Sequence, residues 1–185
     1  MSVFSTGGGA SRPGFFVKYI ESTGTQYIDL KVVPASGYTA EIGFTATYIP
    51  ADAESWVISV FDMSATGYPR MRVGIVSGAY YTDTSNGATY TGTPGEYTEA
   101  TVGVSRSGCK LSLYLFAAHE VNGPAHMENS KYRFYFCRIY DGNKNLIAEF
   151  LPYVDESGIA CVKNTVNGEK LYNAGTDEFL VGGAA

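Results

Sequence analysis

The chain lacks the long runs of Ala, Leu, Glu and Lys that favour helices. No stretch of 12 or more residues keeps a 3.6-residue apolar period, so we expect at most one short helical turn. Tyr (15), Phe (10) and Gly (22) are abundant instead, and this bias favours strands and turns. The composition therefore predicts an all-β protein. A chain of 185 residues can bury roughly 70% of its extended surface, which is enough for one core.

Membrane and nucleic-acid signals are also missing. No segment approaches the ~18 apolar residues of a membrane span, and the first residues (MSVFSTGGGASRPG) lack the charged and apolar regions of a secretory signal. The 13 basic residues are scattered, and the net charge is −5. Binding to a phosphate backbone needs clustered Lys and Arg. We expect no membrane span, no nucleic-acid partner and no export by the standard signal route.

Cysteine is scarce, and its spacing excludes the usual cysteine chemistry. Cys109, Cys137 and Cys161 are far apart, odd in number and form no C-x-x-C pair. This argues against a disulfide framework and against a zinc site. We interpret the three as small buried apolar residues, in keeping with assembly in a reducing cytosol.

Catalytic carboxylate pairs are absent from the strand patterns. Retaining glycosidases hold an acid/base and a nucleophile ~5–5.5 Å apart, and sandwich glucanases place them two residues apart along one strand. Asp52 and Glu54 fall in a Pro-led loop without a further carboxylate in phase. Asp155 and Glu156 are adjacent, so an extended chain would point them to opposite faces. We interpret all four as solvated loop charges.

Other reactive motifs are weak or missing. His119 and His126 share one polar loop with Glu120 and Glu128, but their spacing is not that of tetrahedral metal ligands. No nucleophile-elbow motif is present, although counting residues leaves a Ser-His-Asp triad open. The Gly run at residues 7–9 is not followed by a Lys in P-loop register. We expect no enzyme and no metal site.

Alternating apolar residues predict about a dozen strands with turns at near-regular spacing. This pattern is typical of an antiparallel two-sheet sandwich of the jelly-roll type, with little or no helix. The clearest alternation covers residues 38–48, and the 99–104 and 111–116 segments are expected to be consecutive meander strands across a Ser107-Gly108 turn. The other strands are expected in residues 15–30 (two), 56–61, 70–76, 79–84, 160–166, 170–172 and 179–181. Ser77-Gly78, Asn86-Gly87 and Asn167-Gly168 are expected to be turns, and residues 119–130 the longest loop.

Residues 131–152 predict a central hairpin that closes at Pro152. Its first strand is expected to place Tyr132, Phe134, Phe136, Arg138 and Tyr140 on one face and Arg133, Tyr135, Cys137 and Ile139 on the other. Because both faces carry large apolar groups, we expect the strand to be covered on both sides. Asp141-Gly142-Asn143 supplies residues that tolerate positive φ at the reversal. On this interpretation the hairpin's aromatic residues belong to the core rather than to a ligand site.

Residues 1–14 predict a flexible Gly-rich arm, and residues 15–185 the sandwich domain. The arm has too few apolar residues for a core of its own. It is either a frayed terminus or a segment that docks onto a neighbouring subunit or a larger particle.

Aromatic and polar residues suited to a sugar gather between positions 56 and 90. A protein recognises a sugar with flat aromatic rings beside a few polar groups. The candidate ligand-binding residues are Trp56, Tyr68, Arg70, Arg72, Tyr80, Tyr81 and Tyr90. Tyr68, Tyr80 and Tyr81 flank turns and are expected to be the most exposed. The alternative is that these rings are core or sheet-face packing.

Three segments resemble the concanavalin A-like, laminin-G-type jelly-roll domains of phage structural proteins and gut bacterial surface proteins. They are KYIESTGTQYIDL (18–30), LYLFAAHEVNGPAHMENSKYRFYFCRIYDGNKNLIAEFLP (113–152) and VNGEKLYNAGTDEFLVGG (166–183). The resemblance implies glycan binding, adhesion or decoration, without binding residues to carry over. It also implies calcium in many members, but no matching acidic loop is present here, so no cofactor is expected.

The resemblance places the chain in a virion, as a non-catalytic phage tail, fibre or head-decoration protein that contacts host or mucus glycans. Partners would be the glycan, other virion proteins reached through the arm, and further copies of the chain, a trimer by analogy. The alternative is a bacterial carbohydrate-binding module at the cell surface or outside the cell. The third hypothesis is that the chain is a relative of the glycoside hydrolases.

Overall fold

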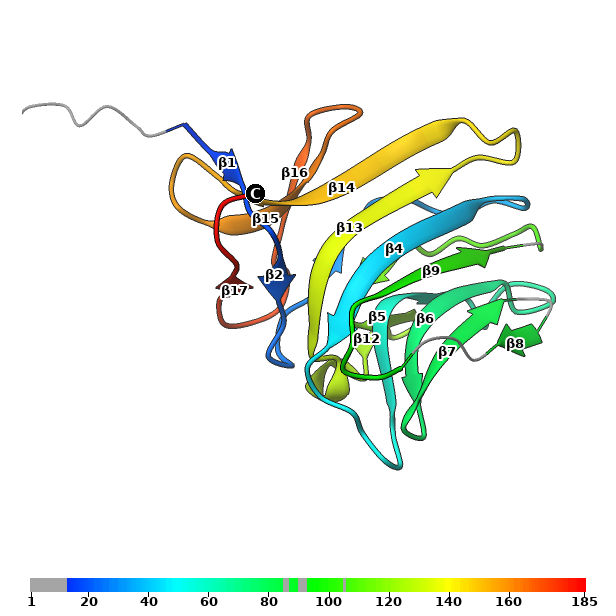
Figure 1. Ribbon diagram of the computed structural model, residues 1–185. Coiled ribbons are helices and arrows are strands. Elements are labelled where there is room, and N and C mark those ends of the chain that lie inside the picture. The colour runs from blue at the N-terminus through cyan, green and yellow to red at the C-terminus, as the bar shows by residue number, and fades with distance from the viewer. Residues whose placement is uncertain (1–12, 85–86, 90–92, 105) are drawn as a thin grey trace, which may run out of the picture.

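The chain forms two antiparallel sheets that pack face to face as a sandwich (Figure 1). The alternating apolar residues of their strands point into the core between them. The computed structural model describes residues 13–84, 87–89, 93–104 and 106–185. The predicted all-β, two-sheet fold is confirmed. In this part of the chain the only helical element is a single 3-10 turn, η1 (Met127–Asn129). No helix of the described residues is long and apolar enough to cross a membrane.

Among the described residues the larger sheet has nine strands, centred on β13. Along one side β13 pairs with β4, and along the other it pairs with β2 in its first half and β14 in its second. The strands of this sheet are β1 (Phe15–Phe16), β2 (Ile20–Glu21), β4 (Thr39–Ala46), β9 (Thr98–Gly103), β13 (Tyr132–Tyr140), β14 (Leu146–Val154), β15 (Ala160–Asn164), β16 (Lys170–Tyr172) and β17 (Leu180–Val181).

In the part of the chain that the structure describes, the smaller sheet has six strands and a hairpin attached to it. Its order is β3 (Ile28–Asp29), β10 (Tyr114–Leu115), β5 (Glu54–Phe61), β6 (Arg70–Val76), β7 (Ala79–Thr84) and β8 (Gly87–Thr89). The hairpin is formed by β11 (Ala118–Glu120) and β12 (Gly123–Ala125). It continues from β10 and lies against β5, as does η1.

The core lies between the sheets and is formed by the inward residues of each alternating strand. In β4 the buried residues are Ala40, Ile42, Phe44 and Ala46, as the sequence pattern predicts. A buried polar contact crosses this core: the Tyr132 hydroxyl donates to the Ser55 carbonyl at 3.0 Å and lies 2.6 Å from the Ser55 hydroxyl. Cys137 and Cys161 are buried and Cys109 is half-buried, all as free thiols.

The hairpin of residues 131–152 is present, but three details of its prediction are wrong. A bulge between Phe134 and Phe136 shifts the register, so the face changes along the strand. Tyr132, Phe134, Cys137 and Ile139 are buried, whereas Arg133, Tyr135, Phe136, Arg138 and Tyr140 are half-buried on the other face. The reversal takes its positive φ at Lys144, and β14 runs through Pro152 to Val154.

Two further expectations are wrong because pairing is set by tertiary contacts. The 99–104 and 111–116 segments are not meander neighbours: β9 pairs with β4 in the large sheet, and β10 pairs with β3 and β5 in the small one. The predicted loop 119–130 contains the β11–β12 hairpin and η1. The Ser77-Gly78 turn is confirmed by its φ values of 48° and 80°. Residues 1–12 of the arm and Asn86 lie outside the described residues.

Candidate functional site on the outer face of the large sheet

Four of the predicted ligand-binding residues meet on the outer face of the small sheet. Arg72 lies over the rings of Trp56 and Phe61, with its guanidinium carbon 4.3 and 4.9 Å from their centroids. The rings of Tyr81 and Trp56 meet edge to face, with their centroids 6.0 Å apart. Arg70 and Arg72 both donate to the carboxylate of Asp83, which is 1% exposed. The strands therefore bring Trp56, Arg70, Arg72 and Tyr81 together.

This cluster is closed rather than open to a ligand. Trp56 is fully buried, and its ring face is covered by the Arg72 guanidinium. Arg72 is further neutralised by Asp83 and by Glu54 at 3.6 Å. Since the Arg72 guanidinium covers the Trp56 ring and is itself held by carboxylates, the packing alternative describes Trp56 and Arg72 better than a sugar platform does.

The other three candidates lie elsewhere. Tyr80 is 2% exposed and packs against Phe44 in the core, so the expectation that it is exposed is wrong. Its hydroxyl accepts from the Ala46 N–H and donates to the Glu96 carbonyl. Tyr68 is 55% exposed, as expected, and lies in the loop between β5 and β6. Tyr90 lies outside the described residues.

A serine, a histidine and an aspartate come together on the outer face of the small sheet without forming a catalytic triad. The His119 ring stacks on Tyr114 at 3.7 Å, and its Nδ1 donates to the Ser112 carbonyl at 2.6 Å. The hydroxyl of Ser112 interacts with Asp29. In a triad the aspartate orients the histidine and the histidine takes the serine proton. Here Nδ1 is occupied by the backbone, so this arrangement does not activate Ser112.

The other histidine, His126, has one carboxylate nearby. Nε2 of His126 lies 3.8 Å from Glu120. Among the residues that the structure describes, no group of three or more His, Cys, Asp and Glu side chains is placed to hold a metal ion.

The outer face of the large sheet carries an open row of aromatic rings, which we name the ring platform: Tyr19, Tyr97, Tyr135 and Phe136. Tyr135 is at its centre, 5.1 Å from Tyr97 and 5.9 Å from Tyr19 between ring centroids. Tyr97 is 53% exposed, and the other three are half-buried. Three separate segments, of which β13 supplies both Tyr135 and Phe136, therefore form one continuous aromatic surface.

Two glycines create the space in which rings lie close to the backbone. A Cβ at Gly43 of β4 would stand 2.5 Å from the Phe136 ring and 3.1 Å from the Tyr97 hydroxyl. A Cβ at Gly182 would stand 2.8 Å from the Tyr19 ring. Glycine inside a strand often marks such a close approach. Side chains at these two positions would lift the rings off the sheet.

Charged groups border the ring platform, each held in place by a neighbour. Arg133 lies over the Tyr19 ring at 4.9 Å and donates to Glu21, and Arg138 lies over Phe136 at 4.7 Å and donates to Glu149. These hydrogen bonds raise the pKa of both guanidinium groups. The bonds fix the positions of the guanidinium planes beside the rings.

The exposed Tyr97 is a hydrogen-bonding group as well as a ring. Its hydroxyl donates to Glu99 at 2.6 Å. Partial burial together with this bond raises the pKa of Tyr97 to about 12, so the phenol stays neutral in the physiological range. The ring and its polar tip are thus held in one orientation.

A hollow of about 270 Å³ adjoins the ring platform across β4 and β13. It is lined by Thr39, Glu41, Thr101, Tyr140 and Lys144. The Tyr140 hydroxyl donates to Glu41 at 3.1 Å, and Glu41 is opposite Arg138, which covers Phe136. The face therefore combines apolar ring surface with hydroxyl, carboxylate and ammonium groups.

Sequence reasoning missed this face because the bulge in β13 was not visible as a pattern. Strict alternation separates Tyr135 from Phe136 and assigns the hairpin's aromatics to the core. One signal was present: Gly43 interrupts an otherwise regular strand at a position that faces away from the core. Tyr97, which precedes β9, carried no comparable signal.

We compared the chain with protein-family models, with curated proteins and with solved structures, and none of them matches it. A proposal for its function therefore rests on the fold and on the face described above.

Proposed function

We propose that the protein is a non-catalytic glycan-binding protein and that the ring platform is its binding face. The observation that carries this proposal is the open set of rings on the large sheet, led by Tyr97 at 53% exposure, beside hydroxyl and charged groups. The proposal moves the site from residues 56–90, whose central Trp56 is covered by Arg72.

The chemistry of this face suits a sugar. A pyranose ring has an apolar C–H face that packs on an aromatic ring, and hydroxyl groups around its edge that need donors and acceptors. The ring platform supplies the first, and the adjoining hollow supplies Glu41, Tyr140 and Lys144 for the second. A flat strip across several strands favours a chain of sugars over a single buried ring.

Binding rather than hydrolysis is proposed because the carboxylates on this face hold other side chains. Glu41 accepts from Tyr140, and Glu99 accepts from Tyr97. Glu149 accepts from Thr165 at 2.6 Å and from Arg138, and these bonds lower its pKa. Retaining or inverting chemistry needs one carboxyl group that stays protonated at working pH. A lowered pKa is opposite to that requirement at Glu149.

The setting that we propose is a virion surface, where the protein serves as a phage adhesion or decoration protein attached through its arm or by self-association. The support is the resemblance of residues 18–30, 113–152 and 166–183 to concanavalin A-like, laminin-G-type domains, together with the two-sheet fold. A bacterial carbohydrate-binding module is the alternative. Neighbouring genes for capsid, portal or tail proteins would favour the virion, and neighbouring polysaccharide-utilisation genes would overturn it.

Glycan binding is tested with immobilised bacterial and mucin glycans. The wild-type protein should bind at least one glycan saturably. Tyr97→Ala should weaken that binding about tenfold, because one stacked ring contributes ~1.4 kcal/mol. Tyr68→Ala is the matched control, since Tyr68 is equally exposed but lies in a loop of the small sheet.

Three outcomes are informative. Loss on Tyr97→Ala with Tyr68→Ala unchanged supports the ring platform. Loss on Tyr68→Ala or Tyr81→Ala instead would return the site to the 56–90 region. A flat response of the wild type across the whole panel would contradict the glycan-binding proposal.

A further inference from the structure

Two lysines lie over aromatic rings at one end of the large sheet, where β1, β14, β15 and β16 meet and the described chain begins (Figure 1). The Lys163 ammonium lies 4.9 Å from the ring centroid of Tyr153 and 5.7 Å from that of Phe16. The Lys170 ammonium lies 5.6 Å from the Tyr153 centroid. The Phe16 ring meets Tyr153 edge to face, with their centroids 5.1 Å apart. We name these four residues the lysine cluster.

The strand register places the lysine cluster on the outer face of the large sheet. Glu149 of β14 is opposite Arg138 on that face. Tyr153 is four residues further along β14, so its side chain points to the same side. The side chains that pair with this outward row of β14, directly or one strand further, are Phe16, Lys163 and Lys170. The lysine cluster and the ring platform therefore share one face.

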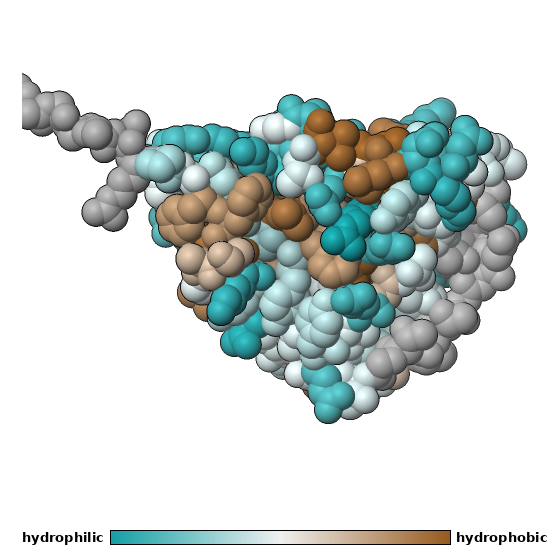
Figure 2. Space-filling view, turned by 45° about the horizontal axis from the view of Figure 1, so that its top comes forward, coloured by the Kyte–Doolittle hydropathy of each residue, from teal (hydrophilic) through white to brown (hydrophobic). Residues whose placement is uncertain are grey.

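The lysine cluster also lies close to the ring platform along the chain. Phe16 is three residues before Tyr19, so their Cα atoms are at most ~11 Å apart. Tyr19 in turn lies 5.9 Å from Tyr135 between ring centroids. Phe16 is 37% exposed, and apolar side chains are open to solvent next to the point where the described chain begins (Figure 2). A ligand that extends across the strands can contact both groups of rings.

Lys163 is the charged group of the cluster that is free to bind a ligand. Lys170 is paired with Glu156, and Glu149 is held by Arg138. Among the described residues Lys163 has no ion pair, and its contacts are with the two rings. The rings do not neutralise an ammonium group, which carries three N–H donors. An anionic group brought to this face would therefore meet an unpaired positive charge.

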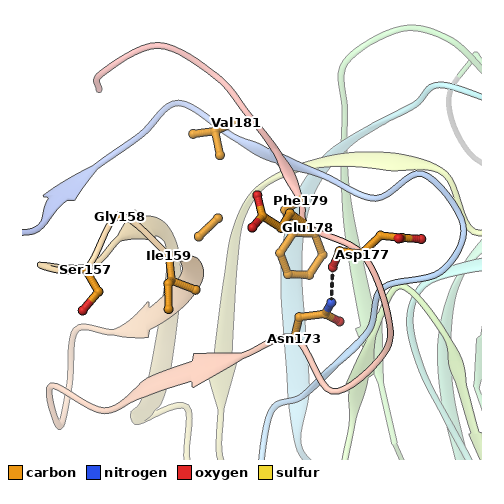
Figure 3. A pocket seen from close by; sticks show the side chains of 9 residues that line it. Ser157, Gly158, Ile159, Asn173, Asp177, Glu178, Phe179 and Val181 are labelled. Carbon is orange, nitrogen blue, oxygen red and sulfur yellow. Dashed lines mark hydrogen bonds between the residues drawn. The ribbon is translucent and has the colours of Figure 1, made fainter.

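The core-facing side of the same end has the opposite character. Val181 is opposite the buried Ile20, and with Ile159 and Phe179 it lines a hollow of about 260 Å³ (Figure 3). The Glu178 carboxylate lies beside Phe179 and Val181, and the described lining of the hollow contains no Lys or Arg. An anionic ligand would be repelled there, so only the outer face of this end suits one.

We propose that the lysine cluster is a second subsite of the glycan-binding face and that the glycan is an anionic polysaccharide, one of whose charged groups binds Lys163. The inference rests on the proposed function and deepens it. Phe16 and the ring platform contact apolar faces of sugars along the chain, and the ammonium supplies the charged contact. A lysine acts on an anion as a point charge, so a carboxylate and a sulfate group both satisfy it.

Two matched pairs of polymers test the proposal and separate the two kinds of charge. Polygalacturonate and its methyl ester differ in carboxylate charge, and dextran sulfate and dextran differ in sulfate charge. At about 50 mM salt the wild-type chain should bind the charged member of at least one pair about threefold to fivefold more tightly than the neutral member. The pair that shows this preference identifies the anion. The preference should shrink at about 500 mM salt, because salt screens an exposed charge.

Lys163→Gln should remove this preference by weakening binding of the charged polymer about threefold to fivefold, with the neutral polymer unchanged. Lys110→Gln is the matched control, since it removes the same charge from an exposed position beside the small sheet. Equal binding of both members of each pair by the wild type overturns the inference, and so does a preference that Lys163→Gln retains. Absence of binding to all four polymers also overturns it. The glycan panel with Tyr97→Ala decides the proposed function separately.

The ring of the lysine cluster gives a second measurement. Phe16→Ala should weaken binding of the charged and the neutral polymer alike, about threefold to tenfold, because a ring contact does not depend on charge. Val181→Ala is the control, since Val181 is 43% exposed but lies on the core-facing side of the same end. Far-ultraviolet circular dichroism must match the wild type for each variant. Unchanged binding in Phe16→Ala would contradict a second subsite at this position.

Discussion

Asp62 shows how a single buried carboxylate is stabilised in its charged form. Its Oδ1 accepts from the Ser64 N–H at 3.0 Å and the Ser64 hydroxyl at 2.6 Å, and its Oδ2 accepts from the Lys110 N–H at 2.8 Å. Burial alone would raise the pKa of Asp62, but these hydrogen bonds outweigh it and the net pKa is lowered. The side chain thereby ties the loop after β5 to the segment before β10.

This arrangement predicts a pH-dependent contribution to stability. Because the folded pKa of Asp62 lies below the ordinary value of 3.8, its contribution is present above that value and is lost as pH falls through the folded pKa. Asp62→Asn should lower the free energy of unfolding by about 1–3 kcal/mol at pH 7. Urea unfolding at pH 7 and pH 3 measures this. The difference between variant and wild type should shrink at pH 3, and an equal difference at both would contradict the account.

The β11–β12 hairpin and η1 show how a segment without a strong sequence pattern becomes ordered. Ser130 is fully buried, accepts from the Trp56 N–H at 3.0 Å and donates to the His126 carbonyl at 2.7 Å. These two bonds fasten the end of η1 to β5. The His119 ring on Tyr114 fastens the other end of the same segment. The segment is therefore held by contacts to the small sheet rather than by its own propensity.

Removing the Ser130 hydroxyl should loosen this element. Ser130→Ala leaves the backbone N–H of Trp56 buried without its acceptor, at a cost of about 1–3 kcal/mol in the free energy of unfolding. Trp56 is the single tryptophan of the chain, so its emission reports directly on this contact. We expect a lower urea midpoint, with a red shift of emission if the hairpin opens before global unfolding. Ser157→Ala, in the exposed β14–β15 turn, should have little effect on either quantity.

Elements of the large sheet also show where pattern reasoning succeeds and where it fails. β4 was predictable because its apolar residues Ala40, Ile42, Phe44 and Ala46 recur at every second position. β13 was predictable as a strand, but its faces were not. The bulge at Tyr135 changes which side chains face solvent, and a bulge depends on how the neighbouring strand pairs. The ring platform follows from that bulge, so it was not predictable from periodicity.

At the scale of the whole molecule the two sheets are joined by apolar packing and by buried polar links, of which the contact between Tyr132 and Ser55 is one. Tyr132 of β13 reaches across the core to Ser55 of β5. Burial raises the pKa of Tyr132 well above its ordinary value, so this phenol is neutral and can donate throughout the physiological range. The link makes the stability of one sheet depend on the other.

Tyr132→Phe should therefore destabilise both sheets together. The Ser55 groups would remain buried with fewer partners, which costs about 1–3 kcal/mol. Unfolding followed by Trp56 emission, which reports on the small sheet, should coincide with unfolding followed by circular dichroism. Tyr140→Phe is the control, because its hydroxyl bonds Glu41 at the surface. Two separate transitions in the wild type would argue against this coupling.

The sequence by itself determined the class of structure: strands, turns at Ser77-Gly78 and similar places, and an all-β sandwich. These are local properties, because alternation and turn residues act over a few neighbours. Only the tertiary structure decided which sheet each strand joins and which face of β13 meets solvent. The same is true of Trp56, whose ring is covered by Arg72, and of Tyr97, whose ring is open. Exposure depends on residues distant in sequence, and no local pattern of aromatic residues encodes it.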